Sequence, residues 1–189
     1  MEWTYYFEMV NVQLRPAQLN DARDIAVVHV DAWRAAYEGL LPPEMLDALR
    51  TEGRAARWSR WIESSLSGNP TDGTHGPSHR LLLAEVDGRA AGWATFGGGR
   101  DDGMTHLGEL AGLYVHPDYW SQKIGHALLE RVDQELRAEG WNQAYLWVLR
   151  GNARAIRFYE EHGWHADGDE KVVDVGGTQL HELRHLRQL

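Results

Sequence analysis

The sequence predicts a mixed α/β fold with a largely antiparallel sheet of six or seven strands and helices on both faces. Short segments with strand-like apolar patterns alternate with longer segments whose apolar residues recur every three or four positions. Asp87-Gly88 separates two of the strand segments, which favours a tight hairpin between antiparallel neighbours. The almost continuously apolar segment 143–149 is typical of a strand buried on both faces, at the centre of a sheet.

The N-terminal half is expected to form one strand followed by helices. Residues 10–15 alternate apolar and polar side chains before a proline, as a first strand would. Residues 21–37 have the spacing of an amphipathic helix. Residues 44–66 continue that spacing with an interruption near Gly53, which favours two short helices. Segment 67–79 is rich in Gly, Pro and Ser and is expected to be a loop.

The C-terminal half alternates strands and helices. The expected strands share short apolar runs bounded by turn residues, and they cover residues 80–86, 89–96, 106–116, 143–149, 172–175 and 180–186. Helices are expected over 125–139 and 152–162, each followed by a glycine. Two glycines within 106–116 indicate a bulge in that strand. We expect a single domain over residues 10–189, preceded by an N-terminal extension, residues 1–9.

The composition excludes several classes of function. The 189 residues include 28 acidic and 19 basic side chains, a net charge of −9, so the surface as a whole repels phosphate backbones and no nucleic-acid partner is expected. The absence of cysteine excludes a disulfide framework, a thiol nucleophile and a thiolate metal site. We find neither a basic leader nor an apolar run of membrane-spanning length, and therefore expect a cytoplasmic protein without a membrane partner.

Residues 109–132 combine a strand, a tight polar loop and the start of a helix. The free N–H groups and the dipole of a helix N-terminus both favour a pyrophosphate. Gly125 lets a diphosphate approach the backbone, Ala127 is too small to block it, and Lys123 adds a cation. For this loop alone, a routine connection between a strand and a helix is the simpler explanation.

Two motifs in order carry a resemblance to a known family. The run Q-K-I-G-H-A, residues 122–127, resembles the Gln/Arg-x-x-Gly-x-Gly/Ala coenzyme loop of the GCN5-related N-acetyltransferases. The preceding L-Y-V-H-P resembles the family's fourth strand, and N-A-R-A-I-R-F-Y-E-E-H-G-W, residues 152–164, resembles its second signature. The order of elements fits from Val10 onward, but the resemblance is specific only over residues 109–164.

The resemblance implies the acyl-CoA N-acyltransferase fold, acetyl-CoA as co-substrate, an amine as acceptor and no metal. The fourth and fifth strands would then run parallel and splay apart after a bulge, with the pantetheine arm between them. The Val115 N–H would also face the thioester carbonyl, where negative charge develops. The implied coenzyme contacts come from the fourth strand, the loop and the next helix: Leu113, Tyr114, Val115, Gln122, Lys123, Ile124, Gly125, His126, Ala127 and Asn152.

The loop departs from the family pattern at three positions. Ser121 and Lys123 stand where many relatives carry glycine, so the loop is expected to be stiffer, and the lysine either helps to bind phosphate or clashes with it. Gln122 replaces the commoner arginine, which weakens charge pairing and keeps backbone donation.

Glu109 and Tyr159 are the candidate catalytic residues. Glu109 lies six residues before Val115, which predicts the same strand face at a distance of about 20 Å and therefore a proton relay through water. The alternative is a solvated strand carboxylate. Tyr159 stands where the family has its usual acid, and the alternative is an aromatic core residue. Trp33 and Tyr37 are weak candidates for the acceptor site because the first-helix region flanks it in the family.

The run H-E-L-R-H, residues 181–185, matches the zinc-protease motif but is set aside. That motif needs a stable helix, whereas the glycine pair before this run favours a strand. In a strand the two histidines would lie about 13 Å apart, too far to share one zinc ion.

Two other functions stay open at this point. One is a non-catalytic module that binds acyl-CoA. The other is an acetyltransferase acting on a protein N-terminus or a charged tRNA, which would need a local basic patch such as Arg54, Arg57 and Arg60. The acceptor is not encoded in any recognisable motif, and a homodimer is the default expectation for a small enzyme with exposed strands.

Overall fold

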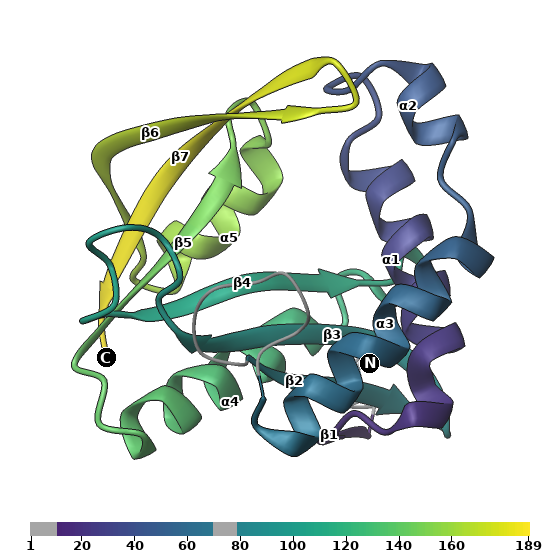
Figure 1. Ribbon diagram of the computed structural model, residues 1–189, viewed down its shortest axis with the longest axis horizontal. Coiled ribbons are helices and arrows are strands. Elements are labelled where there is room, and N and C mark those ends of the chain that lie inside the picture. Colours follow the sequence, from purple (N-terminus) through teal and green to yellow (C-terminus); the bar gives the residue numbers. More distant parts are fainter. Residues whose placement is uncertain (1–10, 70–78) are drawn as a thin grey trace, which may run out of the picture.

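The computed structural model describes residues 11–69 and 79–189, and these form a seven-stranded sheet with helices on both faces (Figure 1). The strand order is β1-β2-β3-β4-β5-β7-β6, and every neighbouring pair is antiparallel except β4 and β5. The strands are β1 (Val12–Pro16), β2 (Arg80–Val86), β3 (Arg89–Gly98), β4 (Gly108–Val115), β5 (Gln143–Leu149), β6 (His165–Val175) and β7 (Thr178–Gln188). This architecture confirms the predicted fold class.

The helices divide between the two faces of the sheet. They are α1 (Ala22–Ala36), α2 (Pro43–Asp47), α3 (Thr51–Ser67), α4 (Ile124–Ala138) and α5 (Ala153–Glu161). Apolar residues of α1 and α3 form one core cluster with β2 and β3, while those of α4 and α5 form another on the opposite face. Leu180, near the tip of the β6–β7 hairpin, and Leu46 of α2 belong to the same core cluster. In the described residues, none of the helices is long and apolar enough to cross a membrane.

Most predicted boundaries agree with the structure, and two differ. Asp87 and Gly88 both have positive φ angles, 50° and 73°, as the predicted tight hairpin turn requires. The interruption expected near Gly53 is wrong, because the break lies at residues 48–50 and Gly53 is inside α3. The final hairpin begins at His165, well before the expected residue 172. The proposed extension 1–9, Val10 and residues 70–78 of the predicted loop lie outside the described residues.

The centre of the sheet opens between β4 and β5. Their parallel pairing comprises only Gly108↔Ala144 and Glu109↔Tyr145, after which the two strands separate. Next to this point β4 has the predicted bulge: the consecutive β3 residues Thr95 and Phe96 pair with Gly112 and Leu110 of β4, so Ala111 is the extra residue. A bulge bends a strand and increases its twist. It therefore accompanies the point at which the two strands separate.

A buried histidine lies in the layer between α1 and the sheet. His29 packs between the rings of Trp33, Trp93 and Tyr114, at centroid distances of 5.3, 5.5 and 5.8 Å. Its Nε2 lies 2.9 Å from a guanidinium nitrogen of Arg54. Because arginine only donates, Nε2 must accept and the ring is neutral. Burial, together with the charges of Arg54 and Arg57, lowers the pKa of His29 to about 3.

This depressed pKa predicts a specific acid instability. Between pH 6.5 and 3 the unfolded chain binds a proton at His29 that the folded chain excludes, so stability is full above pH 6.5 and falls below it. Urea unfolding of wild type should lose up to about 1.4 kcal/mol per pH unit more than His29→Gln, whose amide oxygen still accepts from Arg54. The exposed His165→Gln is the control. Equal pH slopes for wild type and His29→Gln would show that His29 titrates normally.

Candidate functional site

A cavity of about 850 Å³ occupies the opening between β4 and β5. One end lies against the loop before α4 and the start of α5. The other end lies against the C-terminal end of α1 and the β6–β7 hairpin. The walls therefore come from both faces of the sheet and from segments far apart in the sequence.

The main chain of β4 presents polar groups to this opening. The His116 N–H donates to Ala91 O on β3, at 2.8 Å. Main-chain groups of successive residues in a strand point to opposite sides, so those of Val115 and Leu113 point toward β5. The Val115 carbonyl accepts a hydrogen bond from Trp120 Nε1 at 2.8 Å. The N–H of Val115 and both main-chain groups of Leu113 thus face the gap left by the separated strands.

The loop before α4 has an unusual backbone. Ser121 and Lys123 have φ angles of 63° and 62°, in the left-handed region where glycine is favoured. This explains why glycine suits these positions in a loop of this pattern. The Gln122 side chain donates to the Asp118 carbonyl at 3.0 Å and braces the loop. Gln122 therefore lies outside the cavity wall and supports the loop from behind.

The first turn of α4 points its backbone donors at the cavity. Ile124, Gly125 and His126 are the first three residues of the helix, and their N–H groups have no acceptor within it. All three line the cavity, as does Lys123, whereas Ala127 does not. A Cβ on Gly125 would lie 3.5 Å from the Phe158 ring and 3.7 Å from a Val115 methyl, which is ordinary contact. A methyl group therefore fits there.

Positive charge gathers at this end of the cavity. Lys123, Arg154 and Arg157 line it, and in the described parts of the chain none of the three has a carboxylate within 4.0 Å. The Arg154 guanidinium lies 3.6 Å from the centre of the Trp120 ring. Burial lowers the pKa of Arg154, since the charge is partly removed from water. An anionic group of a ligand would relieve that cost.

Asn152 lines the cavity and also caps α5. Its Oδ1 accepts from the Ala155 N–H at 3.1 Å, which satisfies one of the free donors at the start of the helix. The side chain is buried, with 8% exposed. One lone pair of Oδ1 thus serves the helix, and the expected coenzyme contact of Asn152 stays a prediction.

Tyr159 of α5 lies in the cavity wall. It belongs to the core cluster and also lines the cavity. This position is compatible with the predicted acid and with the alternative of an aromatic core residue. Burial raises its pKa, and the nearby Tyr114 raises it further. The hydroxyl therefore keeps its proton at physiological pH. A proton donor to a leaving group must have that property.

The acceptor candidates of the first helix separate in the structure. Tyr37 lines the cavity, and its hydroxyl lies 2.9 Å from that of Tyr114. Trp33 does not line the cavity and lies behind Tyr37, with ring centroids 5.0 Å apart. Trp33 therefore supports the wall and Tyr37 forms part of it.

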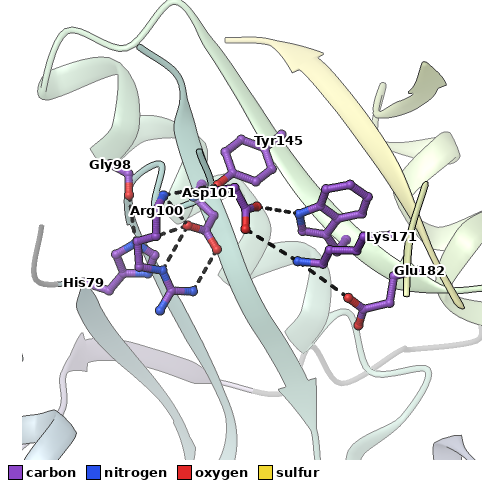
Figure 2. Close-up of polar contacts among 9 residues, drawn as sticks. His79, Gly98, Arg100, Asp101, Tyr145, Lys171 and Glu182 are labelled. Carbon is purple, nitrogen blue, oxygen red and sulfur yellow. Dashed lines mark hydrogen bonds and ion pairs between the residues drawn. The ribbon is translucent and has the colours of Figure 1, made fainter. Parts of the chain in front are cut away.

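Glu109 is buried, and its carboxylate is held by Arg100, which Figure 2 labels. Arg100 donates from Nε at 3.0 Å and from a terminal nitrogen at 2.7 Å, and its backbone N–H adds a third bond at 3.1 Å. His79 lies 3.6 Å away. Burial alone would raise the pKa of Glu109, but the bonds and charge of Arg100 outweigh it and hold the pKa below its ordinary value. Both carboxylate oxygens are occupied.

The expected placement of Glu109 and Val115 on one strand face is wrong. Leu110 and Val115 both pack into the core cluster on the α4 side, whereas Glu109 precedes Leu110 and faces the other way. The bulge at Ala111 adds one residue between them, and a one-residue insertion reverses the alternation of faces. Counting residues from Val115 therefore gives the wrong side.

The structure adds site residues that the sequence did not indicate. Those at the end near the β6–β7 hairpin are Arg100, Trp147, Lys171 and Glu182, and Arg154 lies at the other end. Glu182 is the acidic residue of the H-E-x-x-H run, which lies in β7 as a strand, as predicted. Across residues 11–69 and 79–189 there is no group of three side chains suited to a metal ion. In the sequence, Glu182 stood out only as part of the H-E-x-x-H run, which usually indicates a zinc site and not an acceptor site.

Comparison with known proteins decides the family. The profile described as "Acetyltransferase (GNAT) family" matches residues 33–164, more than half of the chain. The chain belongs to this family. The match includes β4, the loop before α4 and the Asn152–Trp164 segment that carried the resemblance.

Individual relatives and solved structures agree with this assignment. The chain is 28% identical over 172 residues to the uncharacterized N-acetyltransferase YuaI of Bacillus subtilis, covering 91% of this chain and 90% of the relative. It is 27% identical to a probable N-acetyltransferase of Mycobacterium tuberculosis, covering 84% and 82%. A Thermoplasma acidophilum N-acetyltransferase, solved in complex with coenzyme A, has the same fold: TM-score 0.71, 21% identity, and coverage of 95% and 99%.

Proposed function

We propose that this GNAT-family acetyltransferase transfers acetyl from acetyl-CoA to an amine of a small molecule. The observation that carries the proposal is the opening between β4 and β5, which leads from unpaired main-chain groups of β4 to the free N–H groups of α4. An extended pantetheine can pair with β4 as an added strand, and a pyrophosphate suits the helix N-terminus. Lys123, Arg154 and Arg157 supply local positive charge although the whole chain is acidic.

The reaction follows from the same geometry. The amine nitrogen attacks the thioester carbonyl carbon, so a C–N bond forms, the C–S bond breaks and its electron pair leaves on sulfur. The Val115 N–H donates to the carbonyl oxygen while that oxygen carries negative charge. The Tyr159 hydroxyl protonates the departing sulfur, and the resulting phenolate takes the proton that the nitrogen must lose. Tyr159 thereby returns to its starting state.

The charge distribution favours a small cationic acceptor over a macromolecule. Glu182 lies in the cavity wall on the acceptor side. Among the described residues, Lys171 is the only cation that pairs with Glu182. One relative, at 22% identity, is the spermidine N(1)-acetyltransferase of Thermoplasma acidophilum, which acts on such an amine. Arg54 and Arg57 do not line the cavity, so they give little support to a tRNA acceptor. We also propose a cytoplasmic location and a homodimer.

The coenzyme site can be tested at Gly125. Gly125→Trp should abolish binding of coenzyme A, because the indole would fill the space in front of the α4 N-terminus. Gly125→Ala should fold and bind, since its Cβ makes only ordinary contacts. Gly53→Trp, on an open face of α3, is the matched control. Isothermal titration with coenzyme A measures the affinity, and wild-type affinity in a folded Gly125→Trp would disprove the site.

The proposed acid can be tested at Tyr159. Tyr159→Phe should lower turnover on the order of 10²-fold and leave the affinity for coenzyme A nearly unchanged, because the hydroxyl acts on the leaving sulfur. Release of free thiol measures turnover, and titration calorimetry measures affinity. Unchanged turnover, or an equal loss of affinity, would assign Tyr159 to packing alone.

The role of Glu109 as general base stays a prediction, and its bonds to Arg100 favour a positioning role. On that basis Glu109→Gln should lower turnover by a similar factor at every pH and destabilise the fold by about 2 kcal/mol, since a buried ion pair is lost. The pH profile of turnover and urea unfolding measure the two effects. A loss of turnover confined to low pH would instead identify Glu109 as the base.

A further inference from the structure

Glu182 is the carboxylate on the acceptor side of the cavity that is not fixed by hydrogen bonds. It lies on β7, opposite Leu149 of β5 and Lys171 of β6. Its nearest charged neighbour is Lys171 Nζ at 3.7 Å, beyond ordinary hydrogen-bond length. Glu109, by contrast, accepts three bonds from Arg100. Of the two carboxylates that line the cavity near β6 and β7, only Glu182 accepts no hydrogen bond from another of the described residues.

Charged and titratable groups from four other segments lie near Glu182, and Figure 2 shows two of them, Lys171 and Asp101. Lys171 comes from β6, and Asp101 from the segment between β3 and β4, with its Oδ1 3.8 Å from Lys171 Nζ. Tyr37 at the end of α1 and Tyr114 of β4 both lie close enough for the charge of Glu182 to raise the pKa of their hydroxyls. Glu182 thus lies at the junction of the hairpin, α1 and β4.

The ammonium group of Lys171 shows what this part of the cavity accommodates. It lies between the carboxylates of Glu182 and Asp101 and 4.3 Å from the centre of the Trp147 ring, whose Nε1 donates to Asp101 at 2.8 Å. Two carboxylates and an indole face form a suitable environment for an ammonium ion. The Arg184 guanidinium also lies near the Trp147 ring, at 5.9 Å from its centre, but it is paired with Asp167 and Asp169. The carboxylates of Glu182 and Asp101 therefore share one ammonium group between them, which leaves one negative charge for a second cation. A primary ammonium of the acceptor has that chemistry.

We infer that Glu182 is the catalytic base that receives the proton of the acceptor ammonium, an inference that rests on the proposed acetyl transfer. The N–H bond of the ammonium breaks and its proton passes to a carboxylate oxygen of Glu182. The nitrogen keeps the electron pair, which then attacks the thioester carbonyl. After transfer, Glu182 releases this proton to solvent. Lys171 is a positioning residue that holds Glu182 ionised before the acceptor binds.

Burial and the neighbouring carboxylate of Asp101 make Glu182 a better base than an exposed glutamate. Burial raises its pKa, Lys171 lowers it, and Asp101 raises it again, with a net increase. A base with a pKa closer to neutrality takes a proton from an ammonium more readily. The pKa of Glu109 moves in the opposite direction.

The pH dependence of kcat/KM tests this role. The probes are acetyl-CoA and a panel of primary amines that includes spermidine, and the best acceptor is used from pH 5 to 9. In Glu182→Gln only amine that is already neutral can react, so the loss should be on the order of 10²-fold at pH 6 and should shrink steadily toward pH 9. Glu63→Gln, an exposed carboxylate of α3, is the matched control and should match wild type.

A second variant keeps the carboxylate and changes only its charge environment. Lys171→Met removes the cation that lowers the pKa of Glu182, so the acid limb of the wild-type profile should move to higher pH. An unchanged acid limb in Lys171→Met, or a loss in Glu182→Gln that is the same at every pH, would overturn the proposal. Titration with coenzyme A distinguishes a failure of the proposed function from a failure of the inference on Glu182. A wild type that does not bind coenzyme A would refute the proposed function. A wild type that binds coenzyme A but acetylates no amine of the panel would refute the claim that the cavity around Glu182 binds an ammonium acceptor.

Discussion

The separation of β4 from β5 is the constraint on which the rest of the structure depends. A continuous sheet would pair the main-chain groups of Leu113 and Val115 with β5, and no ligand could reach them. Pairing stops after Glu109↔Tyr145, so the cavity forms inside the sheet and not at its edge. The two parts of the sheet, β1 to β4 and β5 to β7, are also held together by contacts outside the sheet, on the side where β4 and β5 separate. Among these, Leu180 of the hairpin and Leu46 of α2 share one core cluster.

The cavity joins two electrostatically different environments. At the α4 end, unpaired cations and free N–H groups suit the phosphates of a coenzyme. At the hairpin end, Glu182 and Asp101 surround a single lysine and suit an ammonium ion. An acidic protein can therefore suit an anionic co-substrate, because the local charge around a site acts on the ligand more strongly than the net charge of −9.

The sequence predicted features whose cause is local and missed those whose cause is tertiary. The Asp87-Gly88 turn and the buried strand 143–149 follow from residue chemistry over a few positions, and the structure has both. The start of β6 was missed because residues 165–170 are exposed and polar and lack an apolar pattern. Only pairing with β7 makes them a strand.

The same division between local and tertiary causes applies to the residues of the candidate site. Lys123, Gly125 and His126 could be named from one short motif, since a loop and a helix N-terminus are contiguous in sequence. Arg100 and Glu182 could not be named, because they reach the cavity from segments far apart in the chain. Glu109 was named but assigned to the wrong face. The bulge beside it was expected, yet its consequence for the alternation of faces depends on which residue is extra, and that was not visible in the sequence.

The left-handed backbone at Ser121 and Lys123 has a consequence for the speed of binding. Non-glycine residues hold this conformation only where their surroundings fix it, and Gln122 and Trp120 brace the loop through bonds to Asp118 and Val115. A loop already fixed in shape does not need to rearrange when a ligand arrives. Association would then be limited by encounter and by steering toward local positive charge, and differences in affinity among coenzyme analogues would arise from how quickly each dissociates.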